Sequence, residues 1–310
     1  MGCKIFYIPS RKQNPIKNIV SLYKLIKHES YDIIHCHILS LSYLIPAYVG
    51  IFLGVPVIIH SHSSSSPKSF FTKLLHYFNK FVIRFFETTN IAVSNPAALW
   101  TFSNMNEVMI VNNGIDVEEY TFNKISRKRI REELTLAGQF VVIHIGAFKK
   151  VKNHEYLLEV FREIITKRRN SKLLLVGGDG DCKDEILKLV KRLGLENNVI
   201  FLGVRNDINV LLSASDLLIF PSLYEGFPNV VLEAQTNGLP CLISDKITDE
   251  VIINPNCQSL SINLEPSQWA DVAMNLNCLN DRTDAIKSVY NRNLDVKSEI
   301  RKIEDIYRRL

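Results

Sequence analysis

The sequence predicts an α/β protein with two domains, each built around a parallel β-sheet. Short apolar runs alternate with helical patterns twice along the chain, up to about residue 116 and again from residue 139. This alternation is typical of β–α–β units. Between the two series lies a polar, basic stretch at residues 118–138, which we interpret as a linker with one exposed helix. The 310 residues, 46% of them apolar, suffice for two hydrophobic cores.

The first series contains five expected strands and three expected helices. The strands are residues 4–8 (KIFYI), 32–36 (DIIHC), 55–60 (VPVIIH), 90–94 (NIAVS) and 107–116, and the helices cover residues 15–28, 40–53 and 69–86. Residues 38–59 form a stretch long and apolar enough to raise the question of a membrane span. Because Pro46, Gly54 and Pro56 interrupt it, we expect a buried helix, a turn and a strand instead.

The expected helix at residues 69–86 carries a stripe of phenylalanines on one face and basic residues on the other. A helix of this kind can lie on an anionic membrane, but most amphipathic helices face a core. The apolar stripe is no broader than a core face needs, so core packing is the favoured interpretation and membrane contact is the alternative.

Three histidines follow the ends of strands in the first series. His35, His37 and His62 stand at or just after the expected strands 32–36 and 55–60. A single histidine at such a position is usually satisfied by local contacts, but three at one sheet edge favour a functional role.

The second series has expected strands at residues 139–146, 172–181, 199–203, 216–220 and 241–245. Asn153 is expected to cap the helix that follows the first of these strands. Lys152, just before it, is well placed to neutralise a diphosphate, although an ordinary surface lysine is the alternative. The glycine-rich exit GGDG at 177–180 is too short for a dinucleotide fingerprint, and therefore predicts close backbone packing.

Residues 221–240, PSLYEGFPNVVLEAQTNGLP, form the centre of the second series. A helix from Val230 to Gly238, capped by Asn229, is expected to cross between two buried strands, with Glu225 in the preceding turn and Glu233 in the first helical turn. A helix amino terminus at the carboxyl end of a parallel strand favours a phosphate, and a carboxylate there can accept hydrogen bonds from ribose hydroxyls. The alternative is a helix-dipole role for Glu233 and a solvated turn position for Glu225.

Composition narrows the class of protein. The six cysteines show no CxxC or metal-type spacing, so neither a disulfide framework nor a zinc site is expected, and a reducing cytosol fits best. The net charge of +5 argues weakly for acidic phosphates or an anionic membrane surface and gives no nucleic-acid signature. No signal peptide is expected, because Lys4 is followed by only a short apolar run.

Several motifs together resemble glycosyltransferase family 4, whose GT-B fold has two Rossmann-like domains facing a cleft. Residues 199–245 resemble its nucleotide-binding half, and Glu225 and Glu233 match the two family glutamates separated by seven residues. GAFKKVKN (146–153) resembles the Gly-Arg-to-Lys-Asn loop, NNGID (112–116) the interdomain turn, and HSH (60–62) the amino-domain histidine. The resemblance covers the chain from about residue 30 to its end.

The resemblance implies a retaining transferase that moves a sugar from a nucleotide-sugar, expected to be a UDP-sugar, to a glycan or lipid-linked acceptor. The pattern is most similar to bacterial capsule or exopolysaccharide enzymes. It implies that Glu233 holds the donor ribose, that Lys152 stabilises the departing diphosphate, and that His62 faces the sugar from the first domain. Glu225 would lie near the donor sugar. The remaining expected donor-binding residues are Gly226, Phe227, Pro228, Asn229 and Gly146. Neither a cofactor nor a metal is expected.

Two departures from the family pattern stand out. Ala147 occupies the position of the family's arginine, so one of two phosphate-stabilising cations is absent, although Lys149 or Lys150 could replace it. Residues 4–8 resemble a later strand of the family's first domain, so the first strand and its glycine-rich loop are expected to be missing. We therefore expect an open sheet edge and impaired activity.

The expected domains are residues 1–120, an acceptor-side domain, and 121–296, a nucleotide-sugar-binding domain. A helix at 297–310 either packs back on the first domain or caps its own. The expected location is cytoplasmic and peripheral on the inner face of the membrane. Two alternative functions stay open: a truncated, non-catalytic nucleotide-binding chain, and a nucleotide-sugar epimerase on the same fold. The epimerase is disfavoured because the flanks of the two glutamates follow the transferase pattern.

Overall fold

The computed structural model describes residues 3–63, 69–276 and 279–310 and divides into two compact units. Unit 1 comprises Met1–Asn112 together with Arg301–Leu310, and unit 2 comprises Asn113–Ile300. Each unit contains one sheet in which every described pairing is parallel. The prediction of an α/β protein with two parallel-sheet domains is confirmed.

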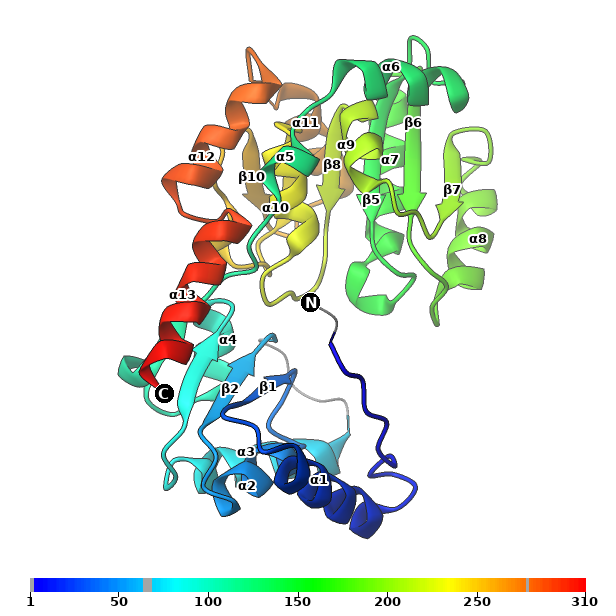
Figure 1. The fold of residues 1–310 in the computed structure, drawn as a ribbon. Coiled ribbons are helices and arrows are strands. Elements are labelled where there is room, and N and C mark those ends of the chain that lie inside the picture. Colours follow the sequence, from blue (N-terminus) through cyan, green and yellow to red (C-terminus); the bar gives the residue numbers. More distant parts are fainter. Residues whose placement is uncertain (1–2, 64–68, 277–278) are drawn as a thin grey trace. The chain divides into compact units, whose positions relative to one another are not determined.

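Unit 1 has a four-stranded sheet whose spatial order follows the chain, β1-β2-β3-β4 (Figure 1). The strands are β1 (Ile34–Ile38), β2 (Val57–Ser61), β3 (Thr89–Ala92) and β4 (Val108–Ile110). The helices are α1 (Pro15–Glu29), α2 (Ile45–Phe52), α3 (Phe70–Ile83) and α4 (Asn95–Thr101), with a short 3-10 turn at Met105–Glu107. The core lies at β2, where all five residues are buried.

The strand expected at residues 4–8 is wrong. These residues adopt no regular structure, and Ile5, Phe6 and Tyr7 are exposed. An apolar run becomes a strand only when a neighbouring strand pairs with its backbone groups, and the described sheet of unit 1 begins at β1.

The apolar stretch at residues 38–59 folds as α2, a turn and β2, as expected. Gly54, at the turn, has φ of +70°, a left-handed conformation that glycine adopts without steric cost. Across the described ranges, every helix is too short or too polar to span a bilayer.

The core position expected for the phenylalanine stripe of α3 is also wrong. The residues that α3 buries are His76, Asn79 and Ile83, whereas Phe70 is 83% exposed and Phe78 is 60% exposed. The buried polar side chains are held by backbone groups: the Leu41 N–H donates to His76 Nδ1 (3.1 Å), and Asn79 Nδ2 donates to the Leu41 carbonyl (2.6 Å). These hydrogen bonds select the polar face as the interior one.

Unit 2 has a six-stranded sheet in the order β10-β9-β8-β5-β6-β7 (Figure 1). The strands are β5 (Phe140–Ile145), β6 (Ser171–Val176), β7 (Val199–Gly203), β8 (Leu217–Phe220), β9 (Cys241–Ser244) and β10 (Cys257–Leu260). The helices are α5 (Val117–Tyr120), α6 (Lys124–Glu133), α7 (His154–Lys167), α8 (Lys183–Arg192), α9 (Ile208–Ala214), α10 (Asn229–Thr236), α11 (Pro266–Asn275) and α12 (Ile286–Asn291). Three 3-10 turns, Lys150–Lys152, Asp249–Val251 and Arg282–Ala285, also belong to this unit.

The strand order of unit 2 reverses between β5 and β8. From β5 the chain moves outward to β6 and β7, and from β8 it moves outward on the other side to β9 and β10. The loops that leave the carboxyl ends of β5 and β8 therefore diverge from one point, which is where open α/β sheets bind ligands.

Helix α13 (Val296–Arg309) begins in unit 2 and ends in unit 1. Within unit 1, Ile306 packs with Ile58 of β2 and Ile91 of β3, and Ile303 joins the same cluster. This packing brings the end of α13, drawn red in Figure 1, against the strands that carry the histidines.

Candidate functional site

The loops after β5 and β8 are joined at the reversal point of the unit 2 sheet. The Leu223 N–H donates to the Val151 carbonyl (2.8 Å), and Asn153 Nδ2 donates to the Pro221 carbonyl (3.2 Å). These bonds hold Lys152 next to Glu225, with Nζ 2.6 Å from Oε1 and both side chains 20% exposed. The structure thus brings together two residues that lie 73 positions apart in the sequence.

Lys152 extends across a glycine. A Cβ atom at Gly146 would lie 3.1 Å from Lys152 Cδ and 3.2 Å from its Cγ and Cε, so the absence of a side chain there leaves room for the lysine. The ammonium group lies 4.7 Å from the centroid of the Phe220 ring, a favourable cation–π contact. Gly146, Phe220 and Glu225 therefore fix the path and the charged end of Lys152.

The glycine-rich exit of β6 packs closely on this loop, as expected. A Cβ atom at Gly177 would lie 2.1 Å from the Gly146 carbonyl oxygen, and one at Gly180 would lie 2.2 Å from the Phe148 carbonyl oxygen. Such separations are far below van der Waals contact, so only glycine fits at either position. The two glycines support the loop that carries Lys152.

Two buried histidines beside Lys152 were not singled out in the sequence. His144 of β5 contacts His154 of α7 edge-on, with ring centroids 4.7 Å apart. Burial, followed by the nearby Lys152 charge, lowers the pKa of His154 to about 4, and burial lowers the pKa of His144 well below its ordinary value. Both rings are therefore neutral near pH 7. Neither histidine stands out in the sequence, because His144 lies inside a strand and His154 is the first residue of a helix.

The expected cap of α10 is wrong, and the expected cap of α7 has the right position but no capping bond. Helix α10 begins at Asn229, so its capping position is Pro228, which offers no side-chain acceptor. The exposed Asn229 instead accepts a hydrogen bond through Oδ1 from Asn113 Nδ2 (2.8 Å). Asn153 occupies the cap of α7 but makes no capping bond, because its amide reaches Pro221. The first turn of α10 thus has no side-chain cap on its N–H groups, which suits an anionic ligand.

Glu233 is the fifth residue of α10, at the start of its second turn, because the helix begins one residue earlier than expected. Burial raises the pKa of its carboxyl group to about 7; a hydrogen bond from the Tyr120 hydroxyl opposes this rise, and the charge of Glu119 adds to it. The Tyr120 carbonyl accepts from Asn237 Nδ2 (3.0 Å), which anchors α5 beside α10. Tyr120 is a site residue that the sequence did not indicate, because it lies in the polar stretch interpreted as a linker.

The three residues after Glu225 present mainly backbone. Phe227 and Pro228 are buried and Gly226 is partly buried. A buried phenylalanine ring leaves its main-chain groups as the contacts available to a ligand. In the loop after β5, Lys149 and Lys150 are exposed, whereas the side chain of Lys152 is fixed by its neighbours.

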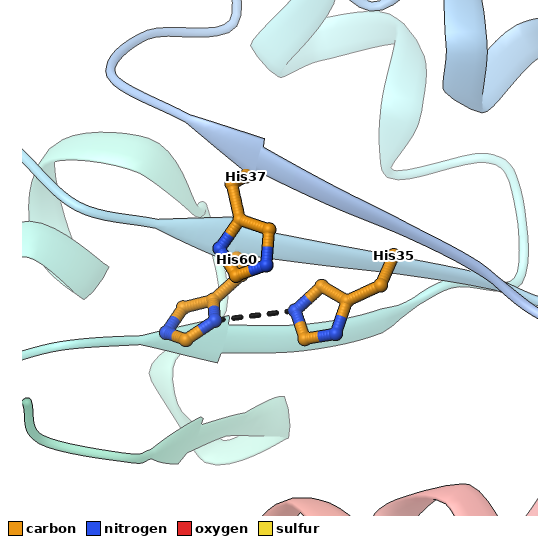
Figure 2. Close-up of side chains that lie close together, drawn as sticks. All are labelled: His35, His37 and His60. Atoms are coloured by element: carbon orange, nitrogen blue, oxygen red, sulfur yellow. Dashed lines mark hydrogen bonds between the residues drawn. The ribbon is translucent and has the colours of Figure 1, made fainter. Parts of the chain in front are cut away.

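Unit 1 contains a cluster of four histidines. His35 and His37 are two residues apart on β1, and His60 of β2 pairs in register with His37, so alternation places these rings on one face of the sheet. His62, two residues beyond His60, joins them: its Nε2 lies 2.8 Å from His37 Nδ1. His35 Nε2 lies 3.2 Å from His60 Nδ1. Figure 2 shows the rings of His35, His37 and His60 gathered together.

The four histidines are neutral near pH 7. Burial, followed by the charges of neighbouring histidines, lowers the pKa of His35 to about 4 and that of His60 to about 3. Burial also lowers the pKa values of His37 and His62. The sequence indicated three members of this cluster but not His60, which only the strand register reveals.

Comparison with known proteins gives matches over nearly the whole chain. The model of the family described as Glycosyltransferase Family 4 matches residues 3–119, and that of Glycosyl transferases group 1 matches residues 126–276. The "Putative glycosyltransferase EpsF" of Bacillus subtilis (strain 168) is 32% identical over 284 residues, which are 87% of this chain and 73% of that protein.

Two further proteins are similar to this chain over most of their length. The UDP-Gal:alpha-D-GlcNAc-diphosphoundecaprenol alpha-1,3-galactosyltransferase of Escherichia coli is 26% identical over 329 residues, covering 98% of this chain and 83% of that protein. The crystal structure of Anabaena Alr3699/HepE in complex with UDP-glucose superposes with a TM-score of 0.81 at 22% identity, covering 97% of this chain and 84% of that one. This structural likeness extends the shared fold across both units.

Proposed function

Because this chain belongs to glycosyltransferase family 4 and has the GT-B fold, we propose that it transfers a sugar from a UDP-sugar to a lipid-linked glycan, with retention of anomeric configuration, in capsule or exopolysaccharide synthesis. The observation that carries the proposal is the pairing of Lys152 with Glu225 at the reversal point of the unit 2 sheet. The Escherichia coli relative, whose name specifies UDP-Gal and a diphosphoundecaprenol-linked acceptor, supports the classes of donor and acceptor.

The proposed chemistry rests on charges held in place before the donor arrives. As the bond between sugar and diphosphate breaks, negative charge develops on the leaving phosphate, and a positioned cation stabilises it. Lys152 supplies that cation, and the uncapped amino end of α10 adds backbone N–H groups. Glu233, in its ionised form, accepts hydrogen bonds from the ribose hydroxyls. The leaving group is stabilised in this proposal by side chains and backbone, without a metal.

Calorimetric titration with UDP and several UDP-sugars, followed by a UDP-release assay with a diphosphoundecaprenol-linked acceptor, tests this function. Lys152→Met should reduce release by about a hundredfold or more, the typical effect of removing one preorganised charge contact. The exposed Lys191 provides the matched control, and Lys191→Met should leave release unchanged. Equal loss in both variants, or unchanged release in Lys152→Met, would contradict the assigned role.

The same assay separates the two alternative functions. UDP binding without release, with every acceptor tried, would favour a non-catalytic nucleotide-binding chain. Release of UDP accompanied by inversion at C2 of the sugar would favour an epimerase. Transfer to the lipid-linked acceptor, with the anomeric configuration read by nuclear magnetic resonance, would establish retention or refute it.

We further propose that α3 docks unit 1 on the anionic inner face of the membrane, where a lipid-linked acceptor resides. The exposed face of α3 and the residues just after it carry several large apolar side chains. They include Phe70, Phe71, Leu74, Phe78, Phe81 and Phe85. Lys73 and Arg84 flank this face, and the Arg84 guanidinium lies over the rings of Phe81 (4.1 Å) and Phe85 (4.8 Å). An apolar face bordered by cations matches the interface of an anionic bilayer.

Co-sedimentation with vesicles of phosphatidylcholine, with and without phosphatidylglycerol, tests the docking. Phe70→Ser combined with Phe78→Ser should weaken binding by about tenfold or more per ring, given about 1.5 kcal/mol or more for each buried phenylalanine. Ile125→Ser, at another exposed apolar position, is the control. Vesicle binding that is equal with and without phosphatidylglycerol would overturn the membrane assignment. So would a dimer in solution that dissociates only in the α3 variants.

A further inference from the structure

We propose that His35, His37 and His60 form a binding site for one divalent transition metal ion of the zinc type, built into the sheet of unit 1. One ring nitrogen from each of the three histidines lies within 4.8 Å of one from each of the others. Three imidazoles supplied by two adjacent strands form the ligand set that Zn²⁺, Ni²⁺ and Cu²⁺ accept.

The spacing of the rings fits one small ion. With Zn–N bonds of about 2.0–2.1 Å in a tetrahedral arrangement, two ligand nitrogens lie about 3.4 Å apart. His35 Nε2 and His60 Nδ1 already lie 3.2 Å apart, the contact drawn as a dashed line in Figure 2. Figure 2 also shows the His37 ring beside these two, and one of its ring nitrogens lies within 4.8 Å of theirs. Three protein ligands leave the fourth tetrahedral position for water or another small ligand.

Contacts on the outer nitrogens determine which atoms face the ion. His35 Nδ1 lies 2.7 Å from the Tyr307 hydroxyl on α13, and His37 Nδ1 lies 2.8 Å from His62 Nε2. A histidine ligand that donates its other N–H to such a partner has its tautomer and ring orientation fixed. We therefore assign Nε2 of His35, Nε2 of His37 and Nδ1 of His60 as the ligand atoms.

The ligand set of this cluster consists of imidazoles alone. Cys36 lies between two of the ligands along β1 and so points to the other face of the sheet. Its buried thiol therefore lies outside the ligand set.

Titration of the metal-free chain with ZnCl₂ by calorimetry, and with CoCl₂ by visible absorption, tests the site. We expect one equivalent of each ion, with the strong d–d bands of tetrahedral cobalt and no thiolate charge-transfer band. His37→Gln, at an exposed position, should remove binding while its thermal unfolding remains cooperative. His28→Gln, at an exposed histidine outside the cluster, should bind like the original protein.

A positioning variant refines the test. Tyr307→Phe should weaken zinc binding by about 10- to 100-fold, the usual effect of losing an outer contact to a histidine ligand. Unchanged affinity in His37→Gln, loss of binding in His28→Gln, or a thiolate band with cobalt would overturn the site. UDP binding by the metal-free protein should be unaltered, which keeps this inference independent of the proposed transfer.

Discussion

The raised pKa of Glu233 predicts that donor binding depends on pH near neutrality. If the ionised carboxylate is the form that accepts hydrogen bonds from the ribose, affinity should follow its ionised fraction. With a pKa of about 7, that fraction falls from about nine-tenths at pH 8 to about one-tenth at pH 6, so affinity should fall about tenfold, or about 1.4 kcal/mol. UDP-glucose is the appropriate probe, because its diphosphate diester does not titrate in this range.

Two neighbours of Glu233 allow the midpoint to be moved in opposite directions. The Tyr120 hydroxyl donates to the carboxylate and lowers its pKa, so Tyr120→Phe should move the midpoint of binding to higher pH. The charge of Glu119 raises that pKa, so Glu119→Gln should move the midpoint to lower pH. Calorimetry at several pH values measures both shifts.

The decisive variant is Glu233→Gln, which should bind UDP-glucose with an affinity that no longer changes between pH 6 and 8. A pH profile that survives in this variant would refute the assignment of Glu233 as the titrating group. Shifts of the same sign in Tyr120→Phe and Glu119→Gln would refute the electrostatic reasoning behind it. Glu196→Gln, an exposed site on unit 2, controls for a general change in charge.

Four further outcomes follow from the same geometry. Gly146→Ala should fold normally but reduce UDP release about tenfold, because the new methyl group must displace the Lys152 side chain by some tenths of an ångström. Gly177→Ala should instead lower the melting temperature sharply, because its methyl group would meet the Gly146 carbonyl at 2.1 Å. The folded pKa of Glu233 lies above its ordinary value of 4.5, so its proton stabilises the fold fully below pH 4.5, and that contribution is lost as pH rises through 7. The melting temperature of Glu233→Gln relative to the original protein should therefore be higher at pH 8 than at pH 5. UDP release should persist in EDTA, and its loss there would contradict a transfer step that needs no metal.

The parallel sheets were predictable because buried strands leave continuous apolar runs in the sequence. The reversal between β5 and β8 was not, since strand order depends on pairings such as Val142 with Leu217 that no local pattern encodes. Lys152 and Glu225 could each be recognised as residues of loops at strand ends. Their contact could not be predicted without knowing that the strand order reverses. The same holds for the position of the neutral His144 and His154 beside them.

Helix α3 shows why a local pattern can predict the wrong face. A hydrophobic stripe predicts burial reliably when the polar face of the helix has no hydrogen-bond partners inside the protein. Here His76 and Asn79 find backbone partners in unit 1, and His76 also stacks on Trp100 with ring centroids 4.3 Å apart. These hydrogen bonds offset part of the cost of burying a polar face, and the phenylalanines remain outside.

The proposed transfer sets two requirements for Lys152 that usually conflict: its ammonium must be held in position, yet it must be available to a diphosphate. Glu225 Oε1 holds the ammonium at 2.6 Å, and both side chains keep contact with solvent. Lys152 can therefore exchange Glu225 for another anion without leaving a fully buried charge unpaired. The rings of His144 and His154 stay neutral beside it and do not repel the ammonium. In the proposed transfer, an arriving diphosphate would therefore take the place of Glu225 as the partner of Lys152, and the carboxylate would become available to the donor sugar as the cation engages the leaving group.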